Sequence, residues 1–425
     1  MKKMSGNVMI KENLKGGELM VKFIHAADLH MDRSFEGLAS LDKKTQDYLL
    51  NANLAVLENI IEASIEHKVD FVLFAGDNFH QNRPSLKMQR HFTEQMNRLN
   101  KIGIPVYLIF GNHDFYQEER YWFDFPENVH LFTSEEIETK KLQVNSGETI
   151  SLSGFSYRHP WIQKEKVLEF PSRSNTDYHV GIYHGELGTE GKGNYAPFSL
   201  SQMKEKNYDY WALGHIHVPS VLNSTPYIVY PGAPQGHTQK EKRSESVLLV
   251  ELDKQHSEIT PIKVSEVTWL TKEISLKTAA TTSESLIIIE NKLSQLNDSF
   301  YLAEVQVKDH QHLGSAFSEK IDSGELLEYL RDNSSNPTSN LFIWRISIKE
   351  EGDQGKIPIY VSNQLVEQLF EQYRSPEDFK QVLREVYGHP EAARVIAELS
   401  DFPEQTVDLA KELLAQDFLF EEAAE

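Results

Sequence analysis

The chain has 425 residues, of which 40% are hydrophobic and 10% aromatic, a composition typical of a globular protein with two or three domains. It contains no cysteine, which excludes disulfides, thiolate metal sites and cysteine nucleophiles. No apolar segment approaches the roughly 20 residues of a membrane-spanning helix. A chain without cysteine suits the reducing cytoplasm, where disulfides are rare, and we expect a cytoplasmic location.

The formal net charge of −21 disfavours nucleic acid as a ligand when it is taken for the whole chain. The charge is unevenly distributed, however. Residues 351–425 contain 17 acidic and 6 basic residues, whereas residues 21–250 contain 29 acidic and 23 basic residues. Two divalent cations bound in the second region would bring its net charge from −6 to −2. Most of the acidity therefore lies outside the region that carries the motifs described below.

Residues 1–20 show no periodicity, and we expect a disordered extension without function. Codons for Lys15-Gly16-Gly17-Glu18 can form a purine-rich ribosome-binding sequence, which makes Met20 a candidate for the natural start. The alternative is a mobile tail. The segment lacks the apolar stretch of a secretory signal.

From Val21 onward, apolar segments predict strands that alternate with amphipathic helices and then give way to short strands, the pattern of an α/β domain. The expected strands are 21–26, 69–75, 105–110, 151–155, 178–183, 210–213, 227–230 and 247–252, and helices are expected around 50–65 and over 85–101. We assign residues 21–265 to this domain. Residues 266–350 predict a small α+β cap, with strands at 269–276, 301–307 and 341–348 and helices at 284–296 and 325–333. Residues 351–425 predict an acidic helical segment.

Short polar motifs follow the predicted strands of the first domain. They are Asp28-Leu29-His30, Gly76-Asp77-Asn78-Phe79-His80, Gly111-Asn112-His113-Asp114, His184-Gly185 and Gly214-His215-Ile216-His217. Since the carboxyl ends of strands in an open α/β sheet border one crevice, these motifs are expected to meet there. Carboxylate, carboxamide and imidazole groups without thiolate favour manganese, iron or zinc over calcium. Two ions at one site could clamp the attacking and leaving oxygens of a phosphoryl displacement.

These five motifs, in this order, resemble the calcineurin-like metallophosphoesterase superfamily over roughly residues 21–250. The resemblance implies a four-layer α/β/β/α sandwich that binds two divalent metal ions, most often Mn²⁺. It implies that one ion is held by Asp28, His30 and His217 and the other by Asn112, His184 and His215, with Asp77 shared by both. It further implies that His113 stabilises the transition state and protonates the leaving oxygen, and that Asp114 orients His113.

Longer segments are similar to bacterial SbcD-like DNA repair exonucleases, most closely to their YhaO branch. They are residues 23–30, 194–198, 208–217 and 230–236. The resemblance implies a catalytic role for His80 in placing the scissile phosphate, DNA as substrate, and C-terminal helices that dock onto an SMC-like (SbcC-type) ATPase. A homodimer also fits this pattern. The chain lacks the Gly-x-x-x-x-Gly-Lys-Ser/Thr motif, so any ATPase is another polypeptide.

Several alternatives stay open at this point. The same metal site could serve a phosphodiesterase that acts on a nucleotide or other small ester, or the chain could be a scaffold subunit for the ATPase. Arg33 and Arg158 could contact DNA phosphates or be solvated surface residues. Lys240, Lys242 and Arg243 are the best candidates for a DNA backbone contact. The C-terminal helices could pack on themselves or dock a partner.

Overall fold

The computed structural model describes residues 20–38, 41–188, 193–254, 257–297, 299–334 and 340–349, together with 360–361, 379, 383, 406–407 and 419–420. The chain divides into two compact units, Met1–Ile348 and Lys349–Glu425. The predicted extension before Met20, most of the polar segment at 334–340 and nearly all of the predicted C-terminal helical segment lie outside the described residues. In the second unit, β16 (Tyr360–Val361) pairs in parallel with β17 (Leu419–Phe420).

The first unit begins with a six-stranded sheet in the order β12-β11-β1-β2-β3-β4. Its strands are Glu258–Lys263 (β12), Ser246–Leu252 (β11), Val21–Ala26 (β1), Phe71–Ala75 (β2), Val106–Ile109 (β3) and Val129–Leu131 (β4). Strands β1 to β4 run parallel, while β11 and β12 are antiparallel to their neighbours.

A second six-stranded sheet has the order β5-β6-β7-β8-β10-β9. Its strands are Glu138–Gln143 (β5), Thr149–Gly154 (β6), Tyr178–His184 (β7), Tyr210–Gly214 (β8), Tyr227–Tyr230 (β10) and Ser220–Ser224 (β9). The four inner strands run parallel, and the two edge strands are antiparallel to them.

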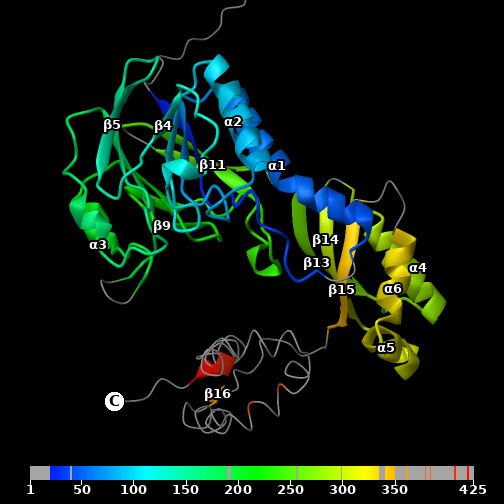
Figure 1. Cartoon of the computed structure of the whole chain (residues 1–425). Helices are drawn as coiled ribbons and strands as arrows, with labels where there is room; N and C mark the ends of the chain where they lie inside the picture. Colours follow the sequence, from blue (N-terminus) through cyan, green and yellow to red (C-terminus); the bar gives the residue numbers. More distant parts are fainter. Residues whose placement is uncertain are drawn as a thin grey trace, which may run out of the picture. The chain divides into compact units, whose positions relative to one another are not determined.

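The two sheets pack face to face because alternate residues of their strands are apolar on both sides. Phe23 and Leu73 of the first sheet and Val180 and Tyr210 of the second share one buried core. The outer face of the first sheet is covered by helices α1 (Lys43–Glu66) and α2 (Leu86–Lys101), and the outer face of the second by α3 (Leu200–Glu205) (Figure 1). The predicted four-layer sandwich is confirmed.

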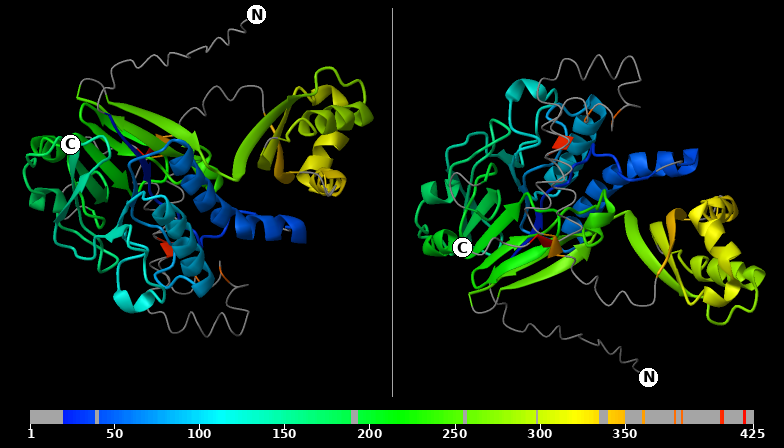
Figure 2. Two further views of the ribbon diagram at one scale, coloured as in Figure 1. Left: turned by 90° about the horizontal axis from the view of Figure 1, so that it is seen from above. Right: turned by 90° about the horizontal axis from the view of Figure 1, so that it is seen from below.

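The third component is a small sheet with the order β13-β14-β15. Its strands are Val267–Ser275 (β13), Phe300–Lys308 (β14) and Leu341–Ile348 (β15), and its helices are Thr282–Leu293 (α4), Ser315–Asp322 (α5) and Glu325–Ser334 (α6). All three strands are parallel, and the helices cover one face of the sheet (Figure 2). Hereafter residues 266–348 are called the cap.

Helix α1 serves both the sandwich and the cap. Leu57 and Ile60 pack on the first sheet, whereas Leu49 and Ala52, two turns earlier, pack against Trp269 and other residues of the cap sheet. Helix starts follow ordinary capping chemistry, since Asp42 accepts a hydrogen bond from the Thr45 amide and Ser85 accepts one from Met88. No helix in the described ranges is both long and apolar enough to cross a membrane.

The sequence-based assignment omitted strands β4, β5, β9 and β12 and helices α3 and α5. All four strands are edges of their sheets. Strand β5 shows why such strands were missed, since its residues are alternately half-buried and exposed and its sequence Glu-Thr-Lys-Lys-Leu-Gln has no apolar alternation. Edge strands bury little side-chain surface, so the hydrophobic pattern that marks central strands is absent.

Leu57 and Leu50 offer a matched pair of substitutions in helix α1, because Leu57 is fully buried and Leu50 is 67% exposed. We expect Leu57→Ala to lower the free energy of unfolding by about 2–5 kcal/mol, since it leaves a cavity under the sheet. Leu50→Ala should change it by less than about 0.5 kcal/mol. Urea unfolding followed by circular dichroism measures both, and equal losses would contradict this packing of α1.

Candidate active site

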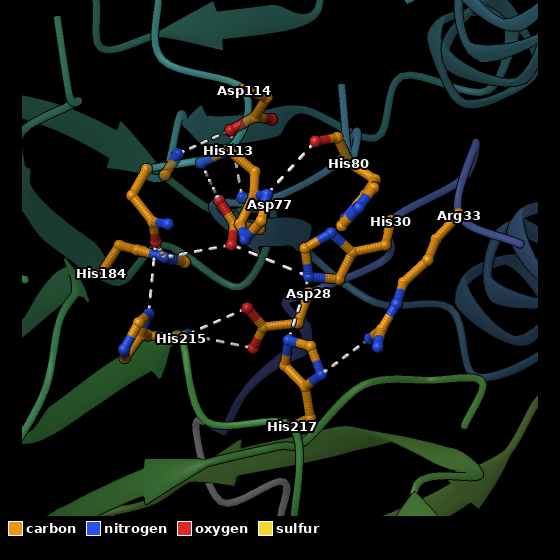
Figure 3. A network of polar contacts seen from close by, with 12 residues as sticks. Asp28, His30, Arg33, Asp77, His80, His113, Asp114, His184, His215 and His217 are labelled. Carbon is orange, nitrogen blue, oxygen red and sulfur yellow. Dashed lines mark hydrogen bonds and ion pairs between the residues drawn. The ribbon is translucent and has the colours of Figure 1, made fainter. Parts of the chain in front are cut away.

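The five polar motifs meet at one edge of the sandwich. Asp28 and Asp77 follow β1 and β2, and Asn112 follows β3, all in the first sheet. His184 ends β7 and His215 follows β8 in the second sheet. Figure 3 shows that the side chains of Asp28, Asp77, His184 and His215 point toward one another from both sheets, together with those of His30 and His217. Asn112 Oδ1 joins them through its contacts with His184 and His215. The polar motifs therefore meet at the strand ends, as the sequence predicts.

His184 lies at the centre of this cluster and is fully buried. Its Nδ1 is 2.9 Å from the carbonyl oxygen of Ala75, so Nδ1 carries a proton and donates it. In the neutral ring Nε2 then bears a lone pair, yet it faces Asn112 Oδ1 at 2.9 Å and Asp77 Oδ2 at 3.4 Å. Facing lone pairs repel unless a proton or a metal cation lies between them. This arrangement fits a metal ligand.

His30 and His217 repeat the arrangement on the other side of Asp77. Their Nε2 atoms are 3.0 Å apart. The Nδ1 atom of His217 is 2.7 Å from Glu241 Oε1 and donates to it, which leaves the Nε2 lone pair of His217 directed at His30. The buried Nδ1 of His30 has no hydrogen-bond partner among the residues that the structure describes. Hydrogen bonds to the rest of the chain do not explain why these two rings lie so close together.

The spacing of the donor atoms matches ion coordination. Two ligand atoms each about 2.1 Å from an ion and at right angles to each other are about 3 Å apart. His215 Nδ1 lies 3.2 Å from Asn112 Oδ1. Donor atoms of Asp28, His30 and His217 lie within 4.8 Å of one another, as do those of Asp28, Asp77 and His184. Asp77 Oδ2 is 3.7 Å from His30 Nε2 as well as 3.4 Å from His184 Nε2, a position suited to a ligand shared by two ions.

The electrostatics of the cluster favour bound cations. Burial lowers the pKa of His184, but the carboxylates of Asp77 and Asp28 outweigh it and raise that pKa to about 9. Without an ion the ring therefore holds a proton on Nε2, at the position where a bound cation would replace it. Burial raises the pKa of Asp28 to about 6. Burial also lowers the pKa of His215 to about 3 and that of His30 well below its usual value, so both rings are neutral, as ligation requires.

The backbone at this edge is tightly constrained. Asp28, His30, Asp77 and His215 all have positive φ, of 54°, 44°, 53° and 107°. Such conformations are costly for residues other than glycine and cluster at functional sites. A Cβ on Gly111 would lie 2.2 Å from Asp77 Oδ1 and 2.7 Å from His184 Nε2. Glycine at 111 is therefore required for these two ligands to approach the loop.

His113 and His80 lie beside the seven predicted ligands. Their rings stack with centroids 4.8 Å apart, and the ring of His113 meets that of His30 edge to face at 5.0 Å. The carbonyl oxygen of His80 is 3.2 Å from His113 Nδ1 and accepts its proton, which leaves His113 Nε2 for other contacts. The backbone of His80 is itself held, since Asp32 Oδ1 accepts from its amide at 2.5 Å.

Asp114 is predicted to orient His113, and among the described residues its carboxylate bonds to backbone amides of the neighbouring loops. The carboxylate of Asp114 is buried and accepts from the backbone amides of Gly111, Asp77 and Asn78 at 2.7, 3.2 and 2.8 Å. It thus joins the two loops that carry Asp77 and Asn112, while the carbonyl of His80 accepts from the His113 ring. Three converging amides satisfy the buried carboxylate of Asp114, as a buried polar group requires.

The structure describes intrachain partners of Arg33, Arg158 and Lys242, three of the basic residues considered for DNA contacts. Arg33 pairs with Glu36 and Glu241, and Arg158 donates to the carbonyl of Thr133. Lys242 Nζ donates to Thr271 Oγ1 of the cap at 2.5 Å. These three cations are thus engaged within the chain.

Glu241 is the residue that sequence reasoning missed. It is 24 positions from His217 and belongs to no recognisable motif, so only the fold brings it to the ring. Tyr195 was also missed as a neighbour of the site, and its ring lies 4.5 Å from that of His215. Tyr195 falls within the segment 194–198 that carries the family resemblance, so this segment was the available signal.

Comparisons with known proteins agree with this geometry. The profile of the calcineurin-like phosphoesterase family matches residues 21–219. The chain is 33% identical to metallophosphoesterase YhaO of Bacillus subtilis over 276 residues, which cover 64% of this chain and 68% of the relative. It is 25% identical to the DNA double-strand break repair protein Mre11 of Methanopyrus kandleri over 288 residues (60% and 59%). It is also 25% identical to the SbcD component of the nuclease SbcCD of Staphylococcus epidermidis over 243 residues (50% and 61%). The chain thus spans about three fifths of the last two relatives.

Removing divalent ions should destabilise the protein, because the lone pairs around Asp77 are then uncompensated. We expect Mn²⁺ to raise the melting temperature of the chelator-treated protein by several degrees, since an ion at 100 times its dissociation constant adds about 2.7 kcal/mol. Differential scanning fluorimetry measures the shift. Asp77→Asn should abolish most of it, and an unchanged shift in that variant would contradict the shared-ligand position of Asp77.

Proposed function

This chain belongs to the calcineurin-like metallophosphoesterase family, and on that premise we propose that it is a manganese-dependent DNA exonuclease of the SbcD/YhaO type. Family membership makes it a metal-dependent phosphoesterase, a hydrolase. The DNA substrate, the exonuclease mode and the choice of Mn²⁺ are the proposal. They are supported by the relatives named above and by a donor set without sulfur.

The observation that carries the hydrolytic part is the cluster of facing lone pairs on either side of Asp77. His184 Nε2 faces Asn112 Oδ1 on one side, and His30 Nε2 faces His217 Nε2 on the other. In this proposal the first ion is held by Asp28, His30 and His217, the second by Asn112, His184 and His215, and Asp77 is shared. When bound, the two ions would activate water and neutralise charge on the phosphoryl oxygens.

The remaining chemistry falls to residues of the chain itself. His113, with Nδ1 donating to the His80 carbonyl, presents Nε2 toward the site and protonates the leaving sugar oxygen. His80 stacks on His113 and is placed to contact the scissile phosphate.

The support for DNA comes from the relatives and not from a basic surface near the site. Of the five basic residues first considered for DNA backbone contacts, Arg33, Arg158 and Lys242 bond within the chain. Lys240 and Arg243 remain candidates for such contacts. We propose that residues 21–265 are the nuclease domain and 266–350 a capping domain. Residues 351–425 are proposed to dock an SMC-like ATPase, and a homodimer is part of the same proposal.

The decisive experiment compares radiolabelled duplex DNA with a generic phosphodiester in Mn²⁺. We expect wild type to degrade DNA, and His113→Ala to lose about 10²- to 10⁴-fold in rate because no group then protonates the leaving oxygen. The Mn²⁺-dependent melting shift of His113→Ala should stay close to that of wild type, since His113 is not a ligand.

Asp77→Ala should abolish turnover of both substrates. If the small ester is hydrolysed while DNA stays intact even with an SMC-like ATPase partner present, the chain is a small-ester phosphodiesterase and the nuclease proposal fails. If neither is hydrolysed although two ions bind, the scaffold role is favoured.

A further inference from the structure

One short segment, residues 235–242, lies between the cap and the proposed metal ligand His217. It includes the single-turn helix η3 (Gln239–Glu241). Its first residue contacts the start of the cap sheet, and Glu241 contacts His217. We call it the coupling segment.

At the cap end, Gln235 is 1% exposed, and its side-chain amide bonds to the backbone where the cap begins and to the carbonyl of Gly236. Its Oε1 accepts from the amides of Glu266 and Val267 at 3.1 and 3.0 Å. Its Nε2 donates to the carbonyl of Val267 at 2.8 Å. The indole Nε1 of Trp269 donates to the carbonyl of Gly236 at 2.9 Å. Strand β13 is therefore fixed to the coupling segment by directional bonds.

At the site end, the buried carboxylate of Glu241 uses both oxygens. Oε2 accepts from the amides of His237 and Thr238 at 2.7 and 3.2 Å, which closes the segment on itself. Oε1 accepts from His217 Nδ1 at 2.7 Å and from Arg33 Nη1 at 3.1 Å. A ring nitrogen held in this way fixes both the tautomer and the direction of the ligating nitrogen.

The segment has little freedom to absorb movement between its two ends. A Cβ on Gly236 would lie 2.4 Å from the carbonyl oxygen of Glu241, so the loop is closed to van der Waals contact. Ser244, just beyond it, donates through Oγ to the carbonyl of His217 at 2.5 Å. The amide of Gly236 donates to the carbonyl of Ser244 at 2.8 Å. A displacement of one end is thus passed to the other.

We propose that Glu241 is a positioning residue for His217 and that the coupling segment makes the ion held by His30 and His217 sensitive to the position of the cap. The inference rests on the proposed role of His217 as a ligand. It predicts that the two ions respond differently to the cap, because the described contacts of the segment reach His217 and none reaches His184 or Asn112.

The test measures Mn²⁺ binding to the full chain by calorimetry, with the fraction of bound ion counted by electron paramagnetic resonance. Glu241→Ala should weaken one of two sites about 10- to 100-fold and leave the other unchanged. Glu241→Gln, whose side-chain oxygen can still accept from His217, should recover part of the loss. The affected site should be the one lost in His217→Ala, so the double variant should bind no more weakly than His217→Ala alone.

The coupling to the cap is tested by Gln235→Ala, since the described side-chain hydrogen bonds of Gln235 go to backbone atoms of Gly236, Glu266 and Val267 and not to a proposed metal ligand. We expect the same site to weaken severalfold while circular dichroism stays native. Glu266→Gln is the matched control, since Glu266 lies on the same seam but bonds to Tyr48 and Asn59 and should leave both sites unchanged.

Unchanged Mn²⁺ binding in folded Glu241→Ala would overturn the positioning role, and unchanged binding in folded Gln235→Ala would overturn the coupling. These failures differ from failure of the proposed function. Wild type that binds fewer than two ions contradicts the two-ion site itself, whereas wild type that binds two ions without cutting DNA contradicts only the substrate.

Discussion

The hydrogen bond from His184 Nδ1 to the carbonyl oxygen of Ala75 is the interaction on which the arrangement of the site depends. It joins β7 of one sheet to the end of β2 of the other at 2.9 Å. The same bond sets the tautomer of His184, so its second nitrogen faces Asp77 and Asn112 as an acceptor. The proposed ion site therefore forms only when the two sheets pack together, because each sheet supplies part of its side chains.

This junction constrains the chain around it. A Cβ on Gly214 would lie 2.1 Å from the Ala75 carbonyl oxygen, and one on Gly76 would lie 2.5 Å from His184 Nδ1. Glycine is the residue that lets the strands approach this closely. Four neighbouring residues accept positive φ angles, and buried Asp114 holds the two loops that turn there. Strain at the site is offset by hydrogen bonds from outside the ligand set.

The cap adds a second level of organisation. Helix α1 packs on both the sandwich and the cap sheet, and the coupling segment binds the first residues of β13. Lys242, whose charge suggested a contact with DNA, bonds instead across this seam. With the inferred coupling, a substrate that shifted the cap would change the binding of the ion held by His30 and His217 and leave the binding of the other ion unchanged. The affinities of the two ions would then depend differently on the position of the cap, because the coupling segment contacts the proposed ligand His217 of only one of them.

The sequence alone predicted which polar residues would meet at one edge of the sandwich and where the central strands lie. Strands β1, β10 and β15 begin and end where their apolar patterns predicted, because a buried strand must be apolar along its length. The polar motifs after strands likewise predicted one converging site, since parallel strands share an edge. Edge strands such as β5 could not be found, because half their side chains face solvent. Only the tertiary structure decided that Glu241 contacts His217 and that the carboxylate of Asp114 accepts from three backbone amides. Such contacts either join residues far apart in the chain or depend on which of several nearby groups a side chain meets. Local sequence patterns do not predict them, because they form only when the sheets pack.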